Sequence, residues 1–464
     1  MDNRLIFKFI ILFFLIFLVN IISLGLSLNS TQIIALSIFS ASVFATLLFW
    51  DFRVAIAFLG IALLLITKTV DLENLIRFAS LEVILFLVGM MVLVGLLKES
   101  GFFAWLVTII IRMRNLNARK FVFLISIISA LLACCVDEVT SIVFMVAAIL
   151  EICDYFEVEP TPYIIISVLS TNIGSTGTVL GNPIGILIAS KSGLTFEDFI
   201  LKAFPLMIIC LLLTILLVNL WYFKSVKELD RNMQRFAANE MLIKLISVPP
   251  ERQLKIGLGV FIITLFFISL HHRLELLWKL ENNTLLLSIP LIFAGIVMIW
   301  KWKRARQYIE KDVDWWTLLF FLLLFAKAGT LKYTAVTGIF AKKIASLAKS
   351  HPLGLTSIIL WTTALGSSIL DNVVLVAAFI PVIQSFKELG FVLQPLWWAL
   401  LFGGCFGGNI TLIGSTANIV ALGILEKERK IKISFFKWLK IGLIVGLLTT
   451  FLVWLALIWH PLYH

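Results

Sequence analysis

Two short polar tips interrupt apolar stretches of this 464-residue chain, and both carry acidic residues. Asp137 and Glu138 lie within residues 121–152, and Asp371 followed by Asn372 lies within a similar stretch further on. An ionisable side chain at membrane depth is costly, so it is a functional candidate by default. A carboxylate in such a place binds Na⁺, carries a proton, or exchanges one for the other. The alternative interpretation is that these acids cap neighbouring half-helices or pair with a buried Lys.

A polar, glycine-rich break follows each tip. Residues 172–183 form the first break, inside the apolar stretch 161–191, and residues 407–418 form the second, inside 396–425. Gly and Pro at this density break a helix, so each stretch is predicted to form two half-helices around an unwound loop. Half-helix N-termini attract anions, while C-termini and unwound carbonyls supply oxygen ligands for Na⁺. Two matched breaks predict a substrate site at the bilayer midplane, although the same Asn, Ser and Thr residues also serve as ordinary helix caps.

The candidate ion- and substrate-binding residues share a position at a tip or in a break. They are Asp137, Glu138, Thr140, Asn172, Gly174, Gly181, Asn182, Asp371, Asn372, Asn409, Thr411, Gly414, Ser415, Thr416 and Asn418. Within this set, Na⁺ is expected at Asp137, Asn172, Asp371 and Asn409. No phosphate loop or nucleotide motif is present in the sequence, so we do not expect ATP-driven transport. The chain is predicted to be a transporter and not an enzyme. The only cofactor expected is a coupling ion, Na⁺ or H⁺.

Composition defines the class of protein. Apolar residues make up 61% of the chain, charged residues 14%, and the mean hydropathy is +1.06, far from the values of a soluble domain. We therefore predict an all-α polytopic membrane protein with about 11 transmembrane helices and two re-entrant hairpins. The net charge of +11 does not indicate nucleic acid, because Lys and Arg cluster in short loops between apolar segments. Arg4 and Lys8 place the N-terminus inside.

An internal repeat emerges from counting along the sequence. Asp371 lies 234 positions after Asp137, and Trp315 lies 234 positions after Leu81, where each opens an apolar span. A three-residue insertion then pairs Asn172 with Asn409. The first repeat begins outside and the second inside, so the two are predicted to be inverted.

The predicted organisation follows this repeat. Hairpin arms at 121–135 and 139–152 are short for spanning, and Phe102 to Met113, ended by Arg112 and Arg114, is predicted to lie along the inner surface. Lys327 is expected to extend towards the membrane interface. The predicted divisions are N-terminal transmembrane helices (1–70), repeat 1 (71–223, with hairpin 121–152 and broken helix 161–191), a cytoplasmic linker (224–255), connecting helices (256–312), and repeat 2 (313–464, with hairpin 354–386 and broken helix 396–425).

Several motifs resemble a known family. The segment 407–423, Gly-Gly-Asn-Ile-Thr-Leu-Ile-Gly-Ser-Thr-Ala-Asn-Ile-Val-Ala-Leu-Gly, is close to a signature of one branch of the ion transporter superfamily. That branch contains arsenite-efflux proteins, NhaD-type Na⁺/H⁺ antiporters and the melanosomal P protein. It has a citrate-transporter-like domain and is distantly related to Na⁺-coupled dicarboxylate carriers. Further resemblances cover about Leu81 to Trp459: Glu99 to Trp105, Val136 to Thr140, Ser170 to Gly174, Val179 to Pro183, and Leu370 to Val373 with Ile380 to Val382.

The resemblance implies a homodimer in which each protomer has a scaffold part and a moving transport part, with elevator-type alternating access. It also implies site roles for Asp137, Thr140, Asn172, Asn182, Asp371, Asn372, Asn409, Ser415 and Asn418. This sequence departs from the family pattern in its first half. Glu138 stands where Asn is usual, Asn182 where Asp is usual, and Ile184 and Gly185 replace Pro and Asn.

These observations predict a secondary transporter that moves a small inorganic ion across the plasma (cell inner) membrane. Na⁺/H⁺ antiport is the first candidate activity, and arsenite or antimonite efflux is the second. One alternative is a Na⁺- or H⁺-coupled carrier of dicarboxylate or sulfate, although acids at both tips disfavour a carboxylate substrate. The other is a membrane scaffold without transport. The expected partners are membrane lipid, the small ion and a second copy of the chain, with no nucleic acid.

Overall fold

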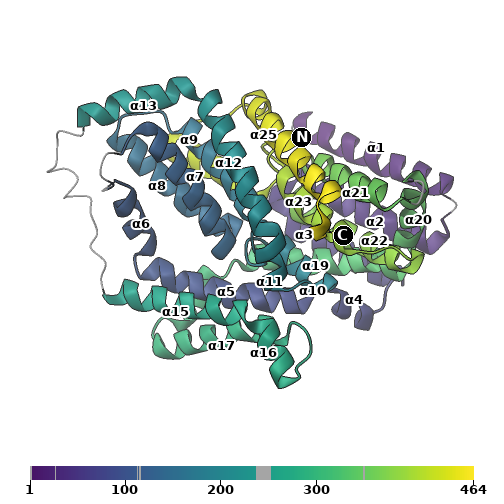
Figure 1. The fold of residues 1–464 in the computed structure, drawn as a ribbon. Coiled ribbons are helices and arrows are strands. Elements are labelled where there is room, and N and C mark those ends of the chain that lie inside the picture. The colour runs from purple at the N-terminus through teal and green to yellow at the C-terminus, as the bar shows by residue number, and fades with distance from the viewer. Residues whose placement is uncertain are drawn as a thin grey trace.

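The computed structural model describes residues 3–26, 28–111, 113, 116–236, 252–348 and 351–463, and all regular secondary structure in these ranges is helical (Figure 1). The chain is an all-α polytopic membrane protein, as predicted. Nine of the described helical segments are long and apolar enough to cross a membrane. They are Leu5–Gly25, Ser30–Leu48, Leu81–Glu99, Ala118–Cys135, Phe196–Trp221, Arg252–Ser269, Trp315–Tyr333, Asn372–Leu389 and Phe435–Trp459.

The N-terminal half contains two leading helices and the first repeat. The leading helices are α1 (Asn3–Gly25) and α2 (Ser30–Leu48). The repeat comprises η1 (Trp50–Phe52), α3 (Arg53–Ile66), α4 (Leu72–Phe78), α5 (Leu81–Glu99), α6 (Phe102–Ile111), α7 (Ala118–Cys135), α8 (Glu138–Tyr155), α9 (Thr161–Gly174), α10 (Pro183–Ser192), α11 (Phe196–Asp198), η2 (Phe199–Ala203) and α12 (Phe204–Trp221).

The C-terminal half begins with three connecting helices, α13 (Phe223–Phe236), α15 (Arg252–Ser269) and α16 (His271–Trp278). The second repeat then comprises α17 (Thr284–Trp300), α18 (Ala305–Gln307), η3 (Tyr308–Asp312), α19 (Trp315–Tyr333), α20 (Val336–Leu347), α21 (Pro352–Ser367), α22 (Asn372–Ser385), η4 (Phe386–Leu389), α23 (Gln394–Gly407), α24 (Thr416–Arg429), α25 (Phe435–Trp459) and η5 (Pro461–Tyr463).

The helix boundaries reproduce the repeat with a nearly constant offset. α5 and α19, α6 and α20, α7 and α21, and α8 and α22 each begin 234 positions apart. α9 and α23, and then α10 and α24, begin 233 positions apart. The second half therefore lacks one residue relative to the first between the hairpin and the break, and it gains no three-residue insertion. The predicted pairing of Asn172 with Asn409 is wrong, because Asn172 lies inside α9 whereas Asn409 follows the end of α23.

The repeat also includes one more segment, on the N-terminal side of each predicted repeat. η1 and α3 together cover 50–66, and α17 covers 284–300, again 234 positions later. The predicted divisions placed both segments outside the repeats, in 1–70 and 256–312, and the structure corrects this. Each packs against the opening span of the other repeat, α3 on α19 and α17 on α5. Likewise α10 packs on α22 and α24 on α8. Such reciprocal packing is that of two repeats related by a pseudo-two-fold axis.

The two hairpins are held by close helix contacts. α7 packs on α9 and α21 packs on α23. A Cβ atom on Gly174 would overlap the backbone of Ala130, and one on Gly407 would overlap the backbone of Ala364. Only glycine allows these helices to approach so closely. The first hairpin has longer arms than predicted, because Asn117 caps α7 by accepting a hydrogen bond from the Lys120 N–H at 2.9 Å.

The predicted cytoplasmic linker is partly an ordered helix. α13 lies across the ends of α7 and α9 in Figure 1, and Val226, Leu229 and Met233 on one face of it are buried. Asp230 accepts a hydrogen bond from the first amide of α7, that of Ala118, at 3.1 Å. The rest of the linker, residues 237–251, lies outside the described residues, as do Arg112 and Arg114.

Candidate functional site

Asp137 occupies the first tip, between α7 and α8. Its Oδ1 accepts the N–H of Thr140 at 2.8 Å, so it caps α8. Its φ of +138° lies in the region that L-residues rarely adopt. A non-glycine residue held there costs roughly 1–3 kcal/mol and persists only where its surroundings enforce it. The residue is 8% exposed, so a buried cap carboxylate marks the turn of this hairpin.

Asp371 occupies the second tip and has more partners. Its Oδ1 accepts the N–H groups of Val373 and Val374 at 3.1 and 3.4 Å. Its Oδ2 accepts the hydroxyl of Thr416, the first residue of α24, at 2.7 Å. Asn372 accepts a further hydrogen bond from the Val373 N–H at 2.9 Å. Both oxygens of the Asp371 carboxylate are therefore engaged by the tip and by the second break.

Glu138 stands apart from both tip aspartates. It is 1% exposed, and its Oε1 accepts a hydrogen bond from Asn372 Nδ2 at 3.4 Å. Its other oxygen, Oε2, has no hydrogen-bond partner among the described residues. Leaving a buried carboxylate oxygen unsatisfied is costly, and the cost is removed when a proton or a cation occupies that position. Glu138 is thus the least satisfied acid of the tips.

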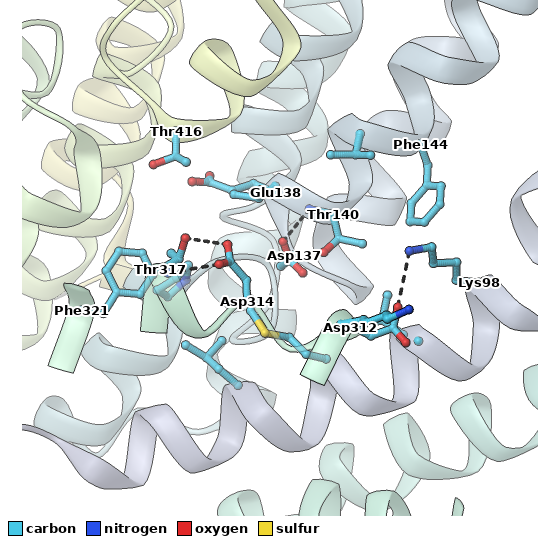
Figure 2. Close-up of a pocket in the computed structure, with 18 of the residues that line it drawn as sticks. Lys98, Asp137, Glu138, Thr140, Phe144, Asp312, Asp314, Thr317, Phe321 and Thr416 are labelled. Carbon is cyan, nitrogen blue, oxygen red and sulfur yellow. Dashed lines mark hydrogen bonds and ion pairs between the residues drawn. The ribbon is translucent and has the colours of Figure 1, made fainter. Parts of the chain in front are cut away.

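These groups meet at a cavity of about 200 Å³, which we call the first cavity. Figure 2 shows Asp137, Glu138 and Thr140 facing Asp314 and Thr317 across it. The cavity is lined by Leu87, Met91, Val94, Gly95, Lys98, Asp137, Glu138, Val139, Thr140, Val143, Phe144, Pro183, Lys311, Asp312, Asp314, Thr317, Phe321, Val373 and Thr416. Both tips and both breaks therefore contribute to one space.

Two acids on the opposite wall of the first cavity, Asp312 and Asp314, were not among the residues predicted from the sequence. Asp314 caps α19, since it accepts the N–H and the hydroxyl of Thr317 at 3.1 and 2.6 Å. Asp312 forms an ion pair with Lys98 at 3.4 Å. Asp314 lies directly before the apolar span that begins at Trp315, so the helix-start pattern was available as a signal.

Asn172 and Asn409 form a network away from the cavity. Asn172 Nδ2 donates to Asn409 Oδ1 and to Asn418 Oδ1, both at 2.9 Å, and its Oδ1 accepts from Ser415 Oγ at 3.1 Å. Asn418 donates to the carbonyl oxygens of Gly408 and Thr411 at 2.8 and 2.9 Å. Every amide oxygen in this trio accepts a hydrogen bond from within the network. In this conformation the four side chains join α9 to the second break instead of lining the cavity.

The other predicted break residues also support the loops. Asn182 caps α10 through the Gly185 N–H at 2.8 Å and donates to Cys405 Sγ of the other repeat at 3.1 Å. Thr411 donates its hydroxyl to the Ser368 carbonyl. Gly181 and Gly414 lie against the backbone of residues 175 and 408, where a Cβ atom would not fit, and Gly174 holds α9 against α7. Lys327, expected at the interface, is instead 2% exposed, because α19 packs against α2 and α3.

The structure therefore divides the predicted set in two. Asp137, Glu138, Thr140 and Thr416 line the first cavity, and Asp371 and Asn372 adjoin it through Thr416 and Glu138. The remaining predicted residues lie behind it. Among the described residues, no group of three or more His, Cys, Asp or Glu side chains has the arrangement of a metal site.

Known proteins resemble this chain in sequence and in fold. Residues 44–403 match the CitMHS family, described as citrate transporter. The chain belongs to the CitMHS family. It is accordingly a membrane transporter. An uncharacterized transporter of Mycobacterium tuberculosis is 31% identical over 370 residues, which is 78% of this chain and 82% of that protein. The P protein of Homo sapiens is 26% identical over 486 residues, covering 89% of this chain and 58% of its own length.

This CitMHS chain also resembles a solved transporter in fold. The crystal structure of the Alcanivorax borkumensis YdaH transporter, described as having an unusual topology, matches with a TM-score of 0.54 at 16% identity. The match covers 86% of this chain and 90% of that one. The expected membership of the ion transporter superfamily is confirmed by these findings.

Proposed function

We propose that this CitMHS chain exchanges a small monovalent cation for protons, with Na⁺/H⁺ antiport as the leading form. The observation that carries the proposal is Oε2 of Glu138, a buried carboxylate oxygen at the first cavity that has no hydrogen-bond partner in the described part of the chain. A single carboxylate that alternates between a cation and a proton is sufficient for exchange. Asp137 lines the same cavity, and Asp371 adjoins it through Thr416.

The charges around the first cavity favour a cation. Asp137, Glu138, Asp312 and Asp314 line it, against the two cations Lys98 and Lys311. Lys98 is already paired with Asp312, and its side chain is 61% exposed, so it lies towards the opening. Lys311 is also exposed. Asp137 and Glu138 are buried, and the guanidinium of Arg53 approaches the cavity only at Thr317, at 3.3 Å. A buried excess of negative charge raises the local concentration of cations and repels anions.

Alternating access is supported by a second cavity on the opposite face, which we call the opposite cavity. It has a volume of about 490 Å³, and its lining residues Lys332, Gly329, Ala328 and Ala377 lie 234 positions after Lys98, Gly95, Val94 and Val143 of the first cavity. The opposite cavity ends at Ala377 and Ile380 on α22 and does not reach the second tip. We infer that exchange of the two repeat conformations would open it towards Asp371 and close the first cavity.

The orientation follows from loop charge. The first cavity opens on the side where α5 ends, α7 begins and α17 ends. Lys98, Lys120, Lys301, Lys303 and Arg304 lie on that side. Loops rich in Lys and Arg stay in the cytoplasm, so the first cavity faces inward and the N-terminus is inside. The plasma membrane is the expected location.

Reconstituted protein tests the proposal. Liposomes that contain the purified chain and an imposed pH gradient should lose the gradient when Na⁺ or Li⁺ is added. Protein-free liposomes and liposomes with the Glu138→Gln variant should keep it. If neither cation affects the gradient with wild-type protein, the antiport proposal is wrong.

Two further assays distinguish the other candidate cargoes, one in the same liposomes and one in cells. The family description favours citrate as a second candidate, and uptake of radiolabelled citrate into the liposomes would establish an anion carrier instead. Arsenite or antimonite efflux would appear as restored growth of an arsenite-sensitive strain. Absence of every flux would favour the scaffold alternative.

The assembly is also part of the proposal. We infer a homodimer with elevator-type motion, in which the hairpins and broken helices move against a scaffold. Light scattering of the detergent-solubilised protein should give twice the 52.3 kDa chain mass after subtraction of the detergent. A monomer would contradict this inference without affecting the assignment of the cavity.

A further inference from the structure

A third cavity reaches the second tip from outside the first cavity. It lies between α2, η1, the second tip and α24, has a volume of about 410 Å³, and we call it the α2 cavity. Its polar or charged lining residues include Thr46 and Asp51 from the N-terminal helices, Asp371 from the tip and Glu426 from α24. It shares no lining residue with the first cavity.

The ionisable residues that line the α2 cavity are all acidic: Asp51, Asp371 and Glu426. Glu426 is paired with Lys432 at 2.9 Å, so the negative charge of the lining comes mainly from Asp51 and Asp371. The remaining wall is apolar, from residues such as Leu47, Leu370 and Ile419. Carboxylates in a space with low-dielectric walls attract cations and repel anions.

Thr46 provides an independent indication of a ligand. This residue is 4% exposed and lines the cavity. Its hydroxyl oxygen is not one of the fully enclosed side-chain atoms that lack a partner among the described residues, so it is reachable from the cavity, where water or an ion can bind it. Thr46 therefore favours a hydrated interior over a dry apolar one.

Arg53 separates the α2 cavity from the first cavity. Its guanidinium lies 4.7 Å from the ring of Trp50, which lines the α2 cavity. The same guanidinium donates to the hydroxyl of Thr317, which lines the first cavity, at 3.3 Å. A fixed positive charge held by an aromatic ring and a hydrogen bond opposes the passage of a cation between the two spaces.

We propose that the α2 cavity is a second, separate route by which a hydrated monovalent cation or a proton reaches Asp371. The inference rests on the proposed cation exchange and deepens it. Asp137 and Glu138 would load through the first cavity, while Asp371 loads through the α2 cavity. Both cavities open on the same side of the membrane, where α2 and α24 end and α19 begins. Arg53 would keep the two ions apart.

Cysteine accessibility tests this route without any knowledge of the cargo. Four of the five native cysteines are buried, so Cys135→Ala gives a background of low reactivity. Val374→Cys places a thiol in the α2 cavity one helical turn after Asp371, and Ile413→Cys supplies a second reporter if the first variant fails to fold. The probes are a cationic trimethylammonium thiosulfonate and an anionic sulfonate thiosulfonate. Leu422→Trp narrows the α2 cavity, and Met91→Trp is the matched change in the first cavity.

We expect the cationic reagent to modify the thiol about ten-fold faster than the anionic reagent, because the ionisable residues that line the cavity are acidic. Leu422→Trp should slow the reaction, and Met91→Trp should not. The proposal is overturned if the thiol resists both reagents, as it would in a lipid-filled cavity. It is equally overturned if both reagents react at the same rate, or if only Met91→Trp protects the thiol. Failure of cation exchange in liposomes would instead refute the proposed function, whatever the accessibility.

Discussion

Asn372 Nδ2 lies 3.4 Å from Glu138 Oε1, and these two residues occupy equivalent positions in the two repeats, 234 residues apart. Equivalent residues can touch only where a pseudo-two-fold axis passes between them. The axis therefore runs through the proposed cation site. One repeat contributes an acid there and the other an amide, so the symmetry of the fold is broken where the charge is needed.

Glu138→Gln should abolish exchange while the protein stays folded, because the amide has nearly the same shape but lacks the charge. We expect a loss of about ten-fold or more in Na⁺-dependent dissipation of a pH gradient, equivalent to ~1.4 kcal/mol or more. Glu275→Gln is the matched control. Glu275 is also 1% exposed, but it accepts the N–H groups of Asn283 and Leu285 at 3.1 and 2.8 Å, outside the cavities. Equal loss of exchange in both variants would refute the role of Glu138.

Asp137→Asn and Asp371→Asn should separate helix capping from ion binding. Asn is as good a cap as Asp, so the melting temperature without Na⁺ should change little. A ligand at 100 times its Kd stabilises the folded state by about 2.7 kcal/mol, and this increment should disappear in a variant that no longer binds Na⁺. Thermal unfolding with Na⁺ and with a bulky organic cation measures it. An unchanged Na⁺ increment in both variants would exclude the tip aspartates as ligands.

Asn172→Ala should destabilise the junction of the repeats instead of acting on ion selectivity. The change leaves the amide oxygens of Asn409 and Asn418 and the Ser415 hydroxyl without their partner. Each buried polar group left unsatisfied costs about 1–3 kcal/mol. Chemical unfolding in detergent provides the measurement. Asn219→Ala on α12 is the control. Nδ2 of Asn219 donates to the Ile215 carbonyl and its Oδ1 has no partner among the described residues, so its loss leaves no other side chain unsatisfied and should cost less than Asn172→Ala.

Gly174→Ala and Gly407→Ala should each destabilise the protein by about 1–3 kcal/mol or more, because the added methyl group meets the backbone of α7 or α21. Gly295→Ala is the control, since no atom lies within 4 Å of its added Cβ and Ala favours a helix by roughly 0.5–1 kcal/mol. Expression yield and the thermal unfolding midpoint are the measurements. Tolerance of both Ala variants would show that α7 can move away from α9, and α21 from α23, without cost.

The sequence predicted the positions of the hairpins and broken helices more accurately than it predicted which residues of the two repeats correspond. The acids of the two tips sit at helix N-caps, so they located both hairpins, and the glycine-rich breaks located both pairs of half-helices. The two breaks were then aligned on Asn172 and Asn409 because their side chains match. The register is fixed instead by Gly174 and Gly407, where backbone meets backbone. In the sequence, the glycine is the one residue type that indicates such a close contact between helices.

The missed groups were missed for a topological reason. Arg53, Thr317 and Asp314 come together because α3 packs on α19, the first span of the other repeat. No sequence pattern predicts this packing of one repeat on the other. The helix α13 could have been found. Val226, Leu229 and Met233 recur at helical spacing among charged residues, and that pattern is typical of an amphipathic helix.

The reciprocal packing of α3 on α19 and of α17 on α5 bears on the ancestry of the molecule. The opening span of each half, α5 or α19, packs against a helix of the other half, α17 or α3. Neither half alone therefore buries the surface of its opening span. An ancestor with a single repeat would have had the same need, and two copies inserted in opposite orientations would have met it. Duplication of such a gene and fusion of the two copies would produce this arrangement. The acid at position 138 and the amide at 372 are a pair of equivalent positions at which the two repeats differ.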